Sequence, residues 1–317
     1  MNFKKNKFLL GILLGVIVGL AWGLDGVLMG EVGKSGVFSD FELSPLVTAL
    51  FHDGFAFFWI ALSLIFSKQL LGAFKLLKTK KGLVTIVGAP VGMSAYLLAI
   101  KYAGAPYASS ISVIYPGVGA ILSYFILKEK LSIRAMIGIA VSLFGSFMLG
   151  FNPAADVPET FFKGVLFALV AVAGWALEGV IVGFAMKKIK NEEHIQATPQ
   201  QFLCVRYFTS LLSYALIVVP LIGGYGVAGK VITSGLVFKY AGIAILGAIT
   251  YLAWYKAVDL IGAAMGTALN STASLWSIIF STVLFGAKIT LSLAIWGFVI
   301  VLGVFIFAID QKQFKKK

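Results

Sequence analysis

The stretch Ala21-Trp22-Gly23-Leu24-Asp25-Gly26-Val27-Leu28-Met29-Gly30 recurs in mid-chain as Gly174-Trp175-Ala176-Leu177-Glu178-Gly179-Val180-Ile181-Val182-Gly183. An offset of 153 residues places Trp22 on Trp175 and the acid Asp25 on the acid Glu178. In each copy the indole and the carboxylate are three residues apart, so a helix presents them on one face. The duplicated pair therefore predicts the core of a functional site, set in segments apolar enough to span a bilayer.

The composition excludes a soluble globular domain. Hydrophobic residues make up 60% of the chain and charged residues only 12%, whereas an ordinary soluble domain has about a quarter of its residues charged. The net charge of +13 raises nucleic-acid binding as an alternative, but the lysines cluster between apolar stretches, as they do beside membrane spans. We therefore expect an all-α integral membrane protein that binds no nucleic acid.

Ten stretches are long and apolar enough for a membrane helix, which needs about 20 residues. The first follows a basic N-terminus, as a signal peptide would, but it runs past Gly30 without a small-residue cleavage site, so we expect a retained helix. The predicted spans lie near residues 8–30, 43–66, 82–102, 106–127, 132–151, 162–186, 200–222, 236–258, 261–285 and 289–309.

The positive charges indicate the orientation of these spans, because short cytoplasmic loops carry more lysine and arginine. With the N-terminus inside, 18 of these residues fall on the cytoplasmic side and six on the opposite side. Both termini are therefore predicted to be cytoplasmic.

The repeat extends beyond the first motif. Tyr96-Leu97-Leu98-Ala99-Ile100-Lys101 corresponds to Tyr251-Leu252-Ala253-Trp254-Tyr255-Lys256, and Glu129-Lys130-Leu131-Ser132 to Ala287-Lys288-Ile289-Thr290. Each half, residues 1–152 and 153–317, then holds five spans, and this odd number makes the second half enter the membrane in the opposite orientation. A five-plus-five inverted repeat is typical of secondary transporters, whose sites lie near the midplane between the halves.

Motifs in both halves resemble a known family. They are Gly92-Met93-Ser94-Ala95-Tyr96, Ala108-Ser109-Ser110-Ile111-Ser112-Val113-Ile114-Tyr115-Pro116, His52-Asp53, the Trp175/Glu178 stretch, Tyr251-Leu252-Ala253-Trp254-Tyr255 and Leu269-Asn270. With the repeat, they resemble the drug/metabolite transporter (EamA-type) superfamily and, within it, the LicB-type choline permeases of bacteria. Asp25 departs from that pattern. The resemblance implies a multi-pass protein of a bacterial plasma membrane that takes up choline.

Five ionisable side chains lie well inside the predicted spans, namely Asp25, His52, Asp53, Glu178 and Arg206. Each should face a cavity or a partner, because a charge at the bilayer centre costs about 2.5–3.5 kcal/mol on insertion scales. The offset of 153 residues also places Asp53 on Arg206, which predicts an ion pair between the halves. Glu178 has no equally obvious cationic partner, so we expect it to face the substrate or a proton.

Six aromatic residues lie in the repeated or family-like segments, namely Trp22, Tyr96, Tyr115, Trp175, Tyr251 and Tyr255. The electron-rich faces of such rings attract a quaternary ammonium ion, whose methyl groups shield its charge from hydrogen bonding. These rings together with one carboxylate predict a binding site for such a cation. Simple packing stays open as the alternative for each ring.

The predicted span 261–285 is unusually polar at Asn270-Ser271-Thr272. Neutral hydrogen-bonding groups there suit either a substrate hydroxyl or bonds between helices, and both alternatives stay open. Asn270 is therefore grouped with Asp25 and His52 among the predicted substrate-binding residues.

Two glycine patterns carry separate predictions. Gly11, Gly15, Gly19 and Gly23 recur at every fourth residue, which permits close packing of a neighbouring helix. The stretch 224–230 matches a dinucleotide fingerprint superficially, but it follows a membrane span instead of a strand, so we expect a turn there.

The leading hypothesis is a transporter that imports a small quaternary ammonium cation, choline first, by alternating access. An exporter of metabolites, amino acids or drugs with the same fold is the alternative, and a sensor or scaffold that transports nothing is a third. The sequence shows no catalytic triad, phosphate loop or metal-ligand cluster, so we expect no enzyme, cofactor or metal. Since the membrane potential alone drives a cation inward, we expect uniport, with a proton as coupling ion left as the alternative.

Overall fold

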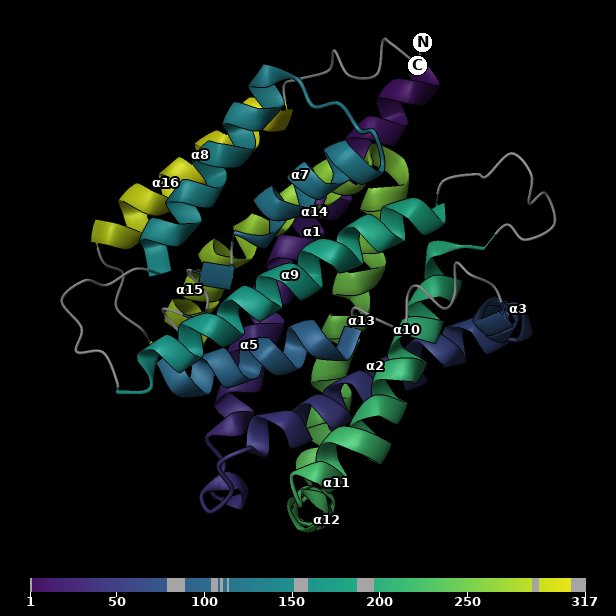
Figure 1. The fold of residues 1–317 in the computed structure, drawn as a ribbon, viewed down its shortest axis with the longest axis vertical. Coiled ribbons are helices and arrows are strands. Elements are labelled where there is room, and N and C mark those ends of the chain that lie inside the picture. Colours follow the sequence, from purple (N-terminus) through teal and green to yellow (C-terminus); the bar gives the residue numbers. More distant parts are fainter. Residues whose placement is uncertain are drawn as a thin grey trace.

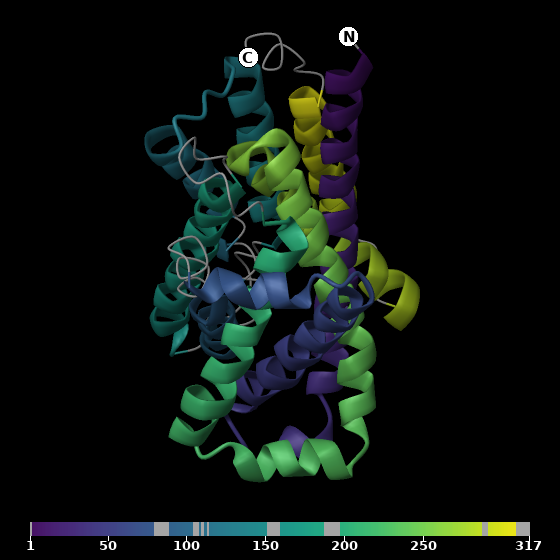
Figure 2. The same cartoon turned by 90° about the vertical axis from the view of Figure 1, so that its right-hand side faces the viewer.

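The structure is a computed structural model that describes residues 2–78, 89–103, 108, 111–112, 114–150, 159–186, 197–286 and 291–308. Every regular element within these ranges is a helix, as the sequence predicts. The helices form a long bundle in which α1 begins and α16 ends on the same side (Figure 1). In Figure 2, α12 lies across the opposite end.

The first half of the chain contains a long N-terminal helix and a series of shorter ones. They are α1 (Asn2–Gly33), the 3-10 helix η1 (Gly36–Phe38), α2 (Ser44–Phe66), α3 (Leu70–Lys75), the 3-10 helix η2 (Leu76–Lys78), α5 (Ala89–Ala103), α7 (Tyr115–Ile126) and α8 (Ile133–Gly150).

The second half contains α-helices of different lengths, together with one π-helix and one 3-10 helix. Its elements are α9 (Phe161–Met186), α10 (Pro199–Ser213), the π-helix η3 (Tyr214–Val218), α11 (Val219–Leu221), α12 (Tyr225–Thr233), α13 (Leu236–Ile261), α14 (Ala263–Ala268), the 3-10 helix η4 (Leu269–Thr272), α15 (Ala273–Phe285) and α16 (Leu291–Ala308).

Among the residues that the structure describes, six helical stretches are long and apolar enough to cross a membrane, so the chain is a multi-pass membrane protein. They are Asn6–Gly33, Ser44–Phe66, Phe161–Ala185, Pro199–Leu221, Leu236–Ile261 and Ala263–Phe285, and each overlaps a predicted span. Shorter apolar helices cover Tyr115–Ile126, Ile133–Met148 and Ile295–Ile306. The predicted span at 82–102 is described only from residue 89, as α5.

The predicted span 261–285 is helical from Ala263 to Phe285, with a 3-10 segment between two α-helical parts. α13 ends at Ile261, Gly262 takes a positive φ of 89°, and the chain continues through α14, η4 and α15. Glycine adopts this backbone conformation readily because it has no Cβ. The polar segment Asn270 to Thr272 lies in the 3-10 helix η4 inside the bundle, where all its residues are buried.

Glu129 of the first half caps the restarted helix. Its Oε1 accepts a hydrogen bond from the backbone N–H of Ala263 and its Oε2 one from Ala264, each at 3.1 Å. The first N–H groups of a helix have no partner inside the helix, and the helix dipole favours a negative charge there. The loop between α7 and α8 thereby fixes the start of α14.

The stretch 224–230 is helical, so the predicted turn was wrong. α12 runs from Tyr225 to Thr233, and it buries Val227, Ala228 and Val231. These three apolar residues stand at helical spacing and pack in a cluster with Tyr240. This burial outweighs the low helix propensity of the glycines.

The glycine spacing in α1 has the packing role that it predicts. A methyl group added at Gly23 would lie 2.6 Å from Trp276 Cβ and 2.8 Å from the backbone nitrogen of Ser277. Gly15 and Gly19 approach Leu269 and Thr272 still more closely. α1 therefore packs with almost no gap along η4 and α15.

Pairs of helices from the two halves lie side by side. α1 packs along α13, α5 along α9, and α8 along α16, and the last two pairs are easily followed in Figure 1. α2 packs against both α10 and α13. Residues from both halves consequently meet in the centre of the bundle.

Candidate functional site

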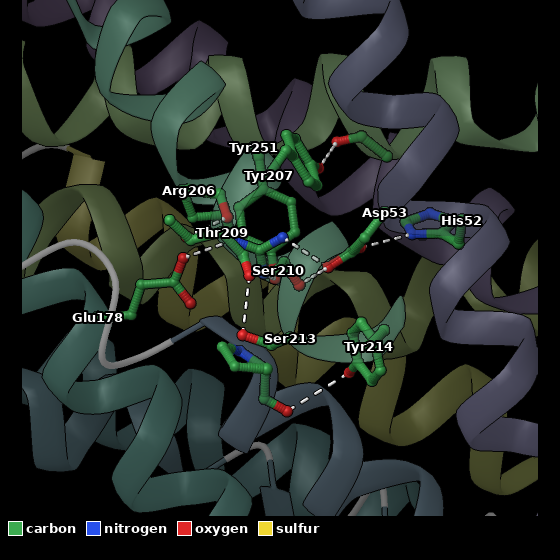
Figure 3. A network of polar contacts seen from close by, with 12 residues as sticks. His52, Asp53, Glu178, Arg206, Tyr207, Thr209, Ser210, Ser213, Tyr214 and Tyr251 are labelled. Carbon is green, nitrogen blue, oxygen red and sulfur yellow. Dashed lines mark hydrogen bonds and ion pairs between the residues drawn. The ribbon is translucent and has the colours of Figure 1, made fainter. Parts of the chain in front are cut away.

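Arg206 joins α10 to α2 in the interior. α10 begins with a capping box formed by Thr198 and Gln201, and it places the fully buried Arg206 against α2. Arg206 Nη1 donates to Asp53 Oδ2 at 3.1 Å, and the Ser210 hydroxyl donates to the same oxygen at 2.5 Å (Figure 3). The two residues predicted as an ion pair are thus in direct contact.

Glu178 has a cationic partner that the sequence did not reveal. Arg206 Nε donates to Glu178 Oε1 at 3.1 Å, and the Tyr255 hydroxyl donates to the same oxygen at 3.0 Å. Sequence spacing could not reveal this partner, because one guanidinium reaches two acids on different helices. The second carboxylate oxygen, Oε2, is buried and has no hydrogen-bond partner in the part of the chain that the structure describes.

His52 and Asp25 extend this network to α1. His52 Nδ1 lies 3.0 Å from Asp53 Oδ1, and its Nε2 lies 3.1 Å from Asp25 Oδ1. An imidazole donates from both nitrogens only when it is protonated. Asp25 and His52, which we grouped with the substrate-binding residues, are in contact with other charged groups. Within the described ranges, no set of three such side chains is arranged to hold a metal ion.

The charge network has more acids than bases. If its three carboxyl groups are ionised, Arg206 and a protonated His52 leave one negative charge uncompensated, and a neutral His52 leaves two. An uncompensated charge away from water is costly. The buried centre therefore contains more acidic than basic side chains.

The predicted aromatic residues gather beside this network. The ring centroid of Trp22 lies 5.6 Å from that of Trp175, 5.8 Å from that of Tyr251 and 6.4 Å from that of Tyr115. Tyr96 joins through Trp175, with 5.1 Å between their centroids. We call these residues, with Trp254 and Tyr255, the aromatic cluster.

Trp254 is a member of the aromatic cluster that the sequence analysis did not select. Its ring centroid lies 6.3 Å from that of Trp22, 5.5 Å from that of Tyr251 and 5.8 Å from that of Tyr255. Its Nε1 donates to Thr267 Oγ1 at 3.1 Å. The signal was available, since residues 251, 254 and 255 share one helical face.

Two tyrosines connect the aromatic cluster to the charge network. The guanidinium carbon of Arg206 lies 4.1 Å from the centroid of the Tyr251 ring, and Arg206 Nη2 donates to the Tyr251 hydroxyl at 2.9 Å. The Tyr255 hydroxyl contacts Glu178. A carboxylate and electron-rich rings therefore adjoin each other in the buried centre of the molecule.

Asn270 joins the aromatic cluster through Tyr115. It is buried in η4, and its Nδ2 donates to the Tyr115 hydroxyl at 2.7 Å. Its Oδ1 has no hydrogen-bond partner among the described residues. The bond between helices, one of the two alternatives for Asn270, is thus present, and the amide oxygen is still free to bind another group.

Apolar membrane helices around a buried, charged and aromatic centre are typical of a membrane transport protein. The model of the EamA-like transporter family matches residues 9–151 and again residues 162–309. The chain therefore belongs to the EamA-like transporter family, whose members are transporters and not enzymes.

Individual relatives agree with this membership. The chain is 28% identical over 275 residues to Protein LicB of Haemophilus influenzae, across 84% of this chain and 87% of that protein. It is 30% identical over 190 residues to an uncharacterized transporter of Clostridium kluyveri, across 56% of each chain. One crystal structure of a protein superposes with a TM-score of 0.71 at 16% identity, covering 94% of this chain and 96% of the other, and it supports the fold alone.

Proposed function

We propose that this transporter imports a small quaternary ammonium cation, with choline as the first candidate, across the plasma membrane of a bacterium. The observation that carries the proposal is the contact between the aromatic cluster and Glu178, whose Oε2 has no partner among the described residues. Ring faces attract a cation that cannot donate hydrogen bonds, and the free oxygen supplies the opposite charge. The resemblance to LicB-type choline permeases supports the same substrate.

An exporter of metabolites, amino acids or drugs would have the same fold. An amino-acid carboxylate, however, needs a cation or several N–H donors, and the Arg206 guanidinium is already engaged by Asp53, Glu178 and Tyr251. The excess of acids in the network also repels an anion. These contacts favour a permanent cation over a zwitterion.

The proposed architecture is a five-plus-five inverted repeat of ten spans, with halves at residues 1–152 and 153–317. Trp22 and Trp175 are equivalent by the offset of 153 residues, and their rings are in contact. Asp53 and Arg206 are equivalent by the same offset, and they share a hydrogen bond. Equivalent residues can touch only near the axis that relates two copies. The two separate matches to the family model support the same division.

Equivalent residues of α8 and α16 also contact each other reciprocally. At an offset of 158 residues, Gly145 corresponds to Gly303 and Ser142 to Ile300. A methyl group at Gly145 would lie 3.0 Å from the Ile300 nitrogen, and one at Gly303 would lie 2.8 Å from Ser142 Cα. These reciprocal contacts support a two-fold relation between the halves.

We infer that the transporter works by alternating access. The proposed substrate-binding residues are Trp22, Tyr96, Tyr115, Trp175, Glu178, Tyr251, Tyr255 and Asn270, with Asp25 and His52 acting through the charge network. Because both halves contribute, rocking one half against the other would expose the site to each side in turn. The lysine distribution supports a cytoplasmic position of both termini.

A thermal-shift panel tests the substrate class. Choline at 100 times its Kd stabilises the folded state by about 2.7 kcal/mol, so it should raise the Tm of the purified protein by a few degrees. Glycine and glutamate should leave the Tm unchanged. A shift with an amino acid but none with choline would favour the exporter.

A matched pair of variants identifies the place of binding. Trp22→Leu removes the ring that contacts four others in the aromatic cluster, and it should abolish the choline shift. Trp296 packs its ring on Phe144, between α8 and α16, so Trp296→Leu should keep the shift. Equal effects of the two variants would argue against binding at the cluster.

A further inference from the structure

Asn270 is the polar side chain of η4 that turns toward the aromatic cluster. Its neighbours are satisfied elsewhere, since Ser271 Oγ lies 2.7 Å from Ser142 Oγ and Thr272 Oγ1 donates to the Leu269 carbonyl at 3.0 Å. Asn270 instead contacts Tyr115 and leaves its amide oxygen unpaired within the described part of the chain. A buried polar atom without a partner costs free energy, so its retention calls for a ligand.

The Tyr115 hydroxyl completes a polar pair beside the rings. It accepts from Asn270 Nδ2, and its own proton can still be donated. The pair thus offers an acceptor in the amide oxygen and a donor in the phenol. A hydroxyl group, which both donates and accepts, matches this pair.

Two buried oxygens without partners in the described residues therefore adjoin one aromatic cluster. Glu178 Oε2 carries the charge of a carboxylate, and Asn270 Oδ1 is neutral. Glu178 contacts Tyr255 in the cluster, while Asn270 contacts Tyr115. A ligand with a cationic head and a hydroxyl satisfies both oxygens at once.

We propose that Asn270 and Tyr115 bind the hydroxyl of a hydroxyalkyl quaternary ammonium, and so determine specificity within the substrate class. The inference rests on the proposed function, because it assumes a quaternary ammonium head among the rings. A substrate with a carboxylate in place of the hydroxyl would bring a negative charge to the Asn270 oxygen and is disfavoured. An alkyl analogue would leave that oxygen buried and unpaired.

The test compares choline with n-propyltrimethylammonium, in which a methyl group replaces the hydroxyl. Binding of each to the purified protein is measured by calorimetry. The wild type should bind choline about tenfold or more tightly than the alkyl analogue, the factor expected for one buried hydrogen bond. Asn270→Ala should weaken choline about tenfold and leave the analogue unchanged, so that the preference disappears. Tyr115→Phe, which keeps the ring, should reduce the preference in the same direction.

Ser271→Ala is the matched control, because Ser271 is in the same 3-10 turn but bonds to α8. It should retain the wild-type preference for choline. Equal affinity of the wild type for both ligands would overturn the inference while leaving the proposed function intact. An equal loss of both ligands in Asn270→Ala would also overturn it, since that is the mark of a structural role. If neither ligand binds the wild type, the proposed function itself fails.

Discussion

Arg206 bonds to two acids, so replacing it should destabilise the protein more than replacing either acid. Removing Arg206 leaves both Asp53 and Glu178 without their cation, whereas removing Asp53 leaves Arg206 paired with Glu178. We expect Arg206→Gln to destabilise by about 3–5 kcal/mol and Asp53→Asn by less. The double variant should recover part of the summed loss. Unfolding in a detergent series measures the loss of stability in the two single variants and in the double variant. If the loss in the double variant equals the sum of the two single losses, the two residues are not coupled.

The repeat predicts which residues are equivalent, but it does not predict which of them touch. The offset of 153 residues was enough to pair Asp53 with Arg206 and to select Trp22 with Trp175. It could not show that the long guanidinium also reaches Glu178, or that His52 bridges two acids. Those contacts depend on side-chain directions around a helix crossing, which spacing along one chain does not define.

At the scale of single elements, Glu129 links the α7–α8 loop to the helix that leads to η4. Glu129→Ala removes the acceptor of two backbone N–H groups, so the first turn of α14 should fray. Hydrogen exchange at Ala263 and Ala264 should become at least tenfold faster, equivalent to about 1.4 kcal/mol. Lys130→Ala, in the same loop, should leave this exchange unchanged. Unaltered protection in Glu129→Ala would show that the cap does not hold the helix.

The glycines of α1 provide a second test of an element. Gly23 faces the backbone of α15, which cannot yield, so Gly23→Ala should destabilise by about 1–3 kcal/mol. Gly26, on the same helix, would place a methyl group in open space. Gly26→Ala should therefore be neutral or stabilise by up to about 1 kcal/mol. Similar unfolding curves for both variants would contradict the close packing of α1 on α15.

The sequence located the helices better than their interruptions. Hydropathy over residues 261–285 is continuous, so it predicts one helix, although Gly262 and the polar run at Asn270 mark the two places where the structure departs from it. The glycines of α12 suggested a turn, but burial of Val227 and Val231 favours a helix. In both cases tertiary contacts outweigh local propensity.

For the whole molecule, the membrane potential should be sufficient to drive uptake. One positive charge gains about 2.3 kcal/mol at 100 mV, or roughly fifty-fold accumulation. Choline uptake into proteoliposomes at equal pH should therefore rise when a potassium diffusion potential makes the lumen negative. Uptake that ignores the potential but follows a pH gradient would replace uniport by coupling to a proton.

The most direct measurement is uptake of labelled choline into proteoliposomes by the wild type and Glu178→Gln, with an inside-negative potential. Glu178→Gln keeps the size of the side chain and removes the charge beside the aromatic cluster. Losing one charge of a buried pair costs about 2–5 kcal/mol, so we predict at least a thirtyfold loss of apparent affinity. Glu31→Gln, an acid of α1 paired with Lys34, should transport as the wild type does. Wild-type choline affinity in Glu178→Gln would contradict the account.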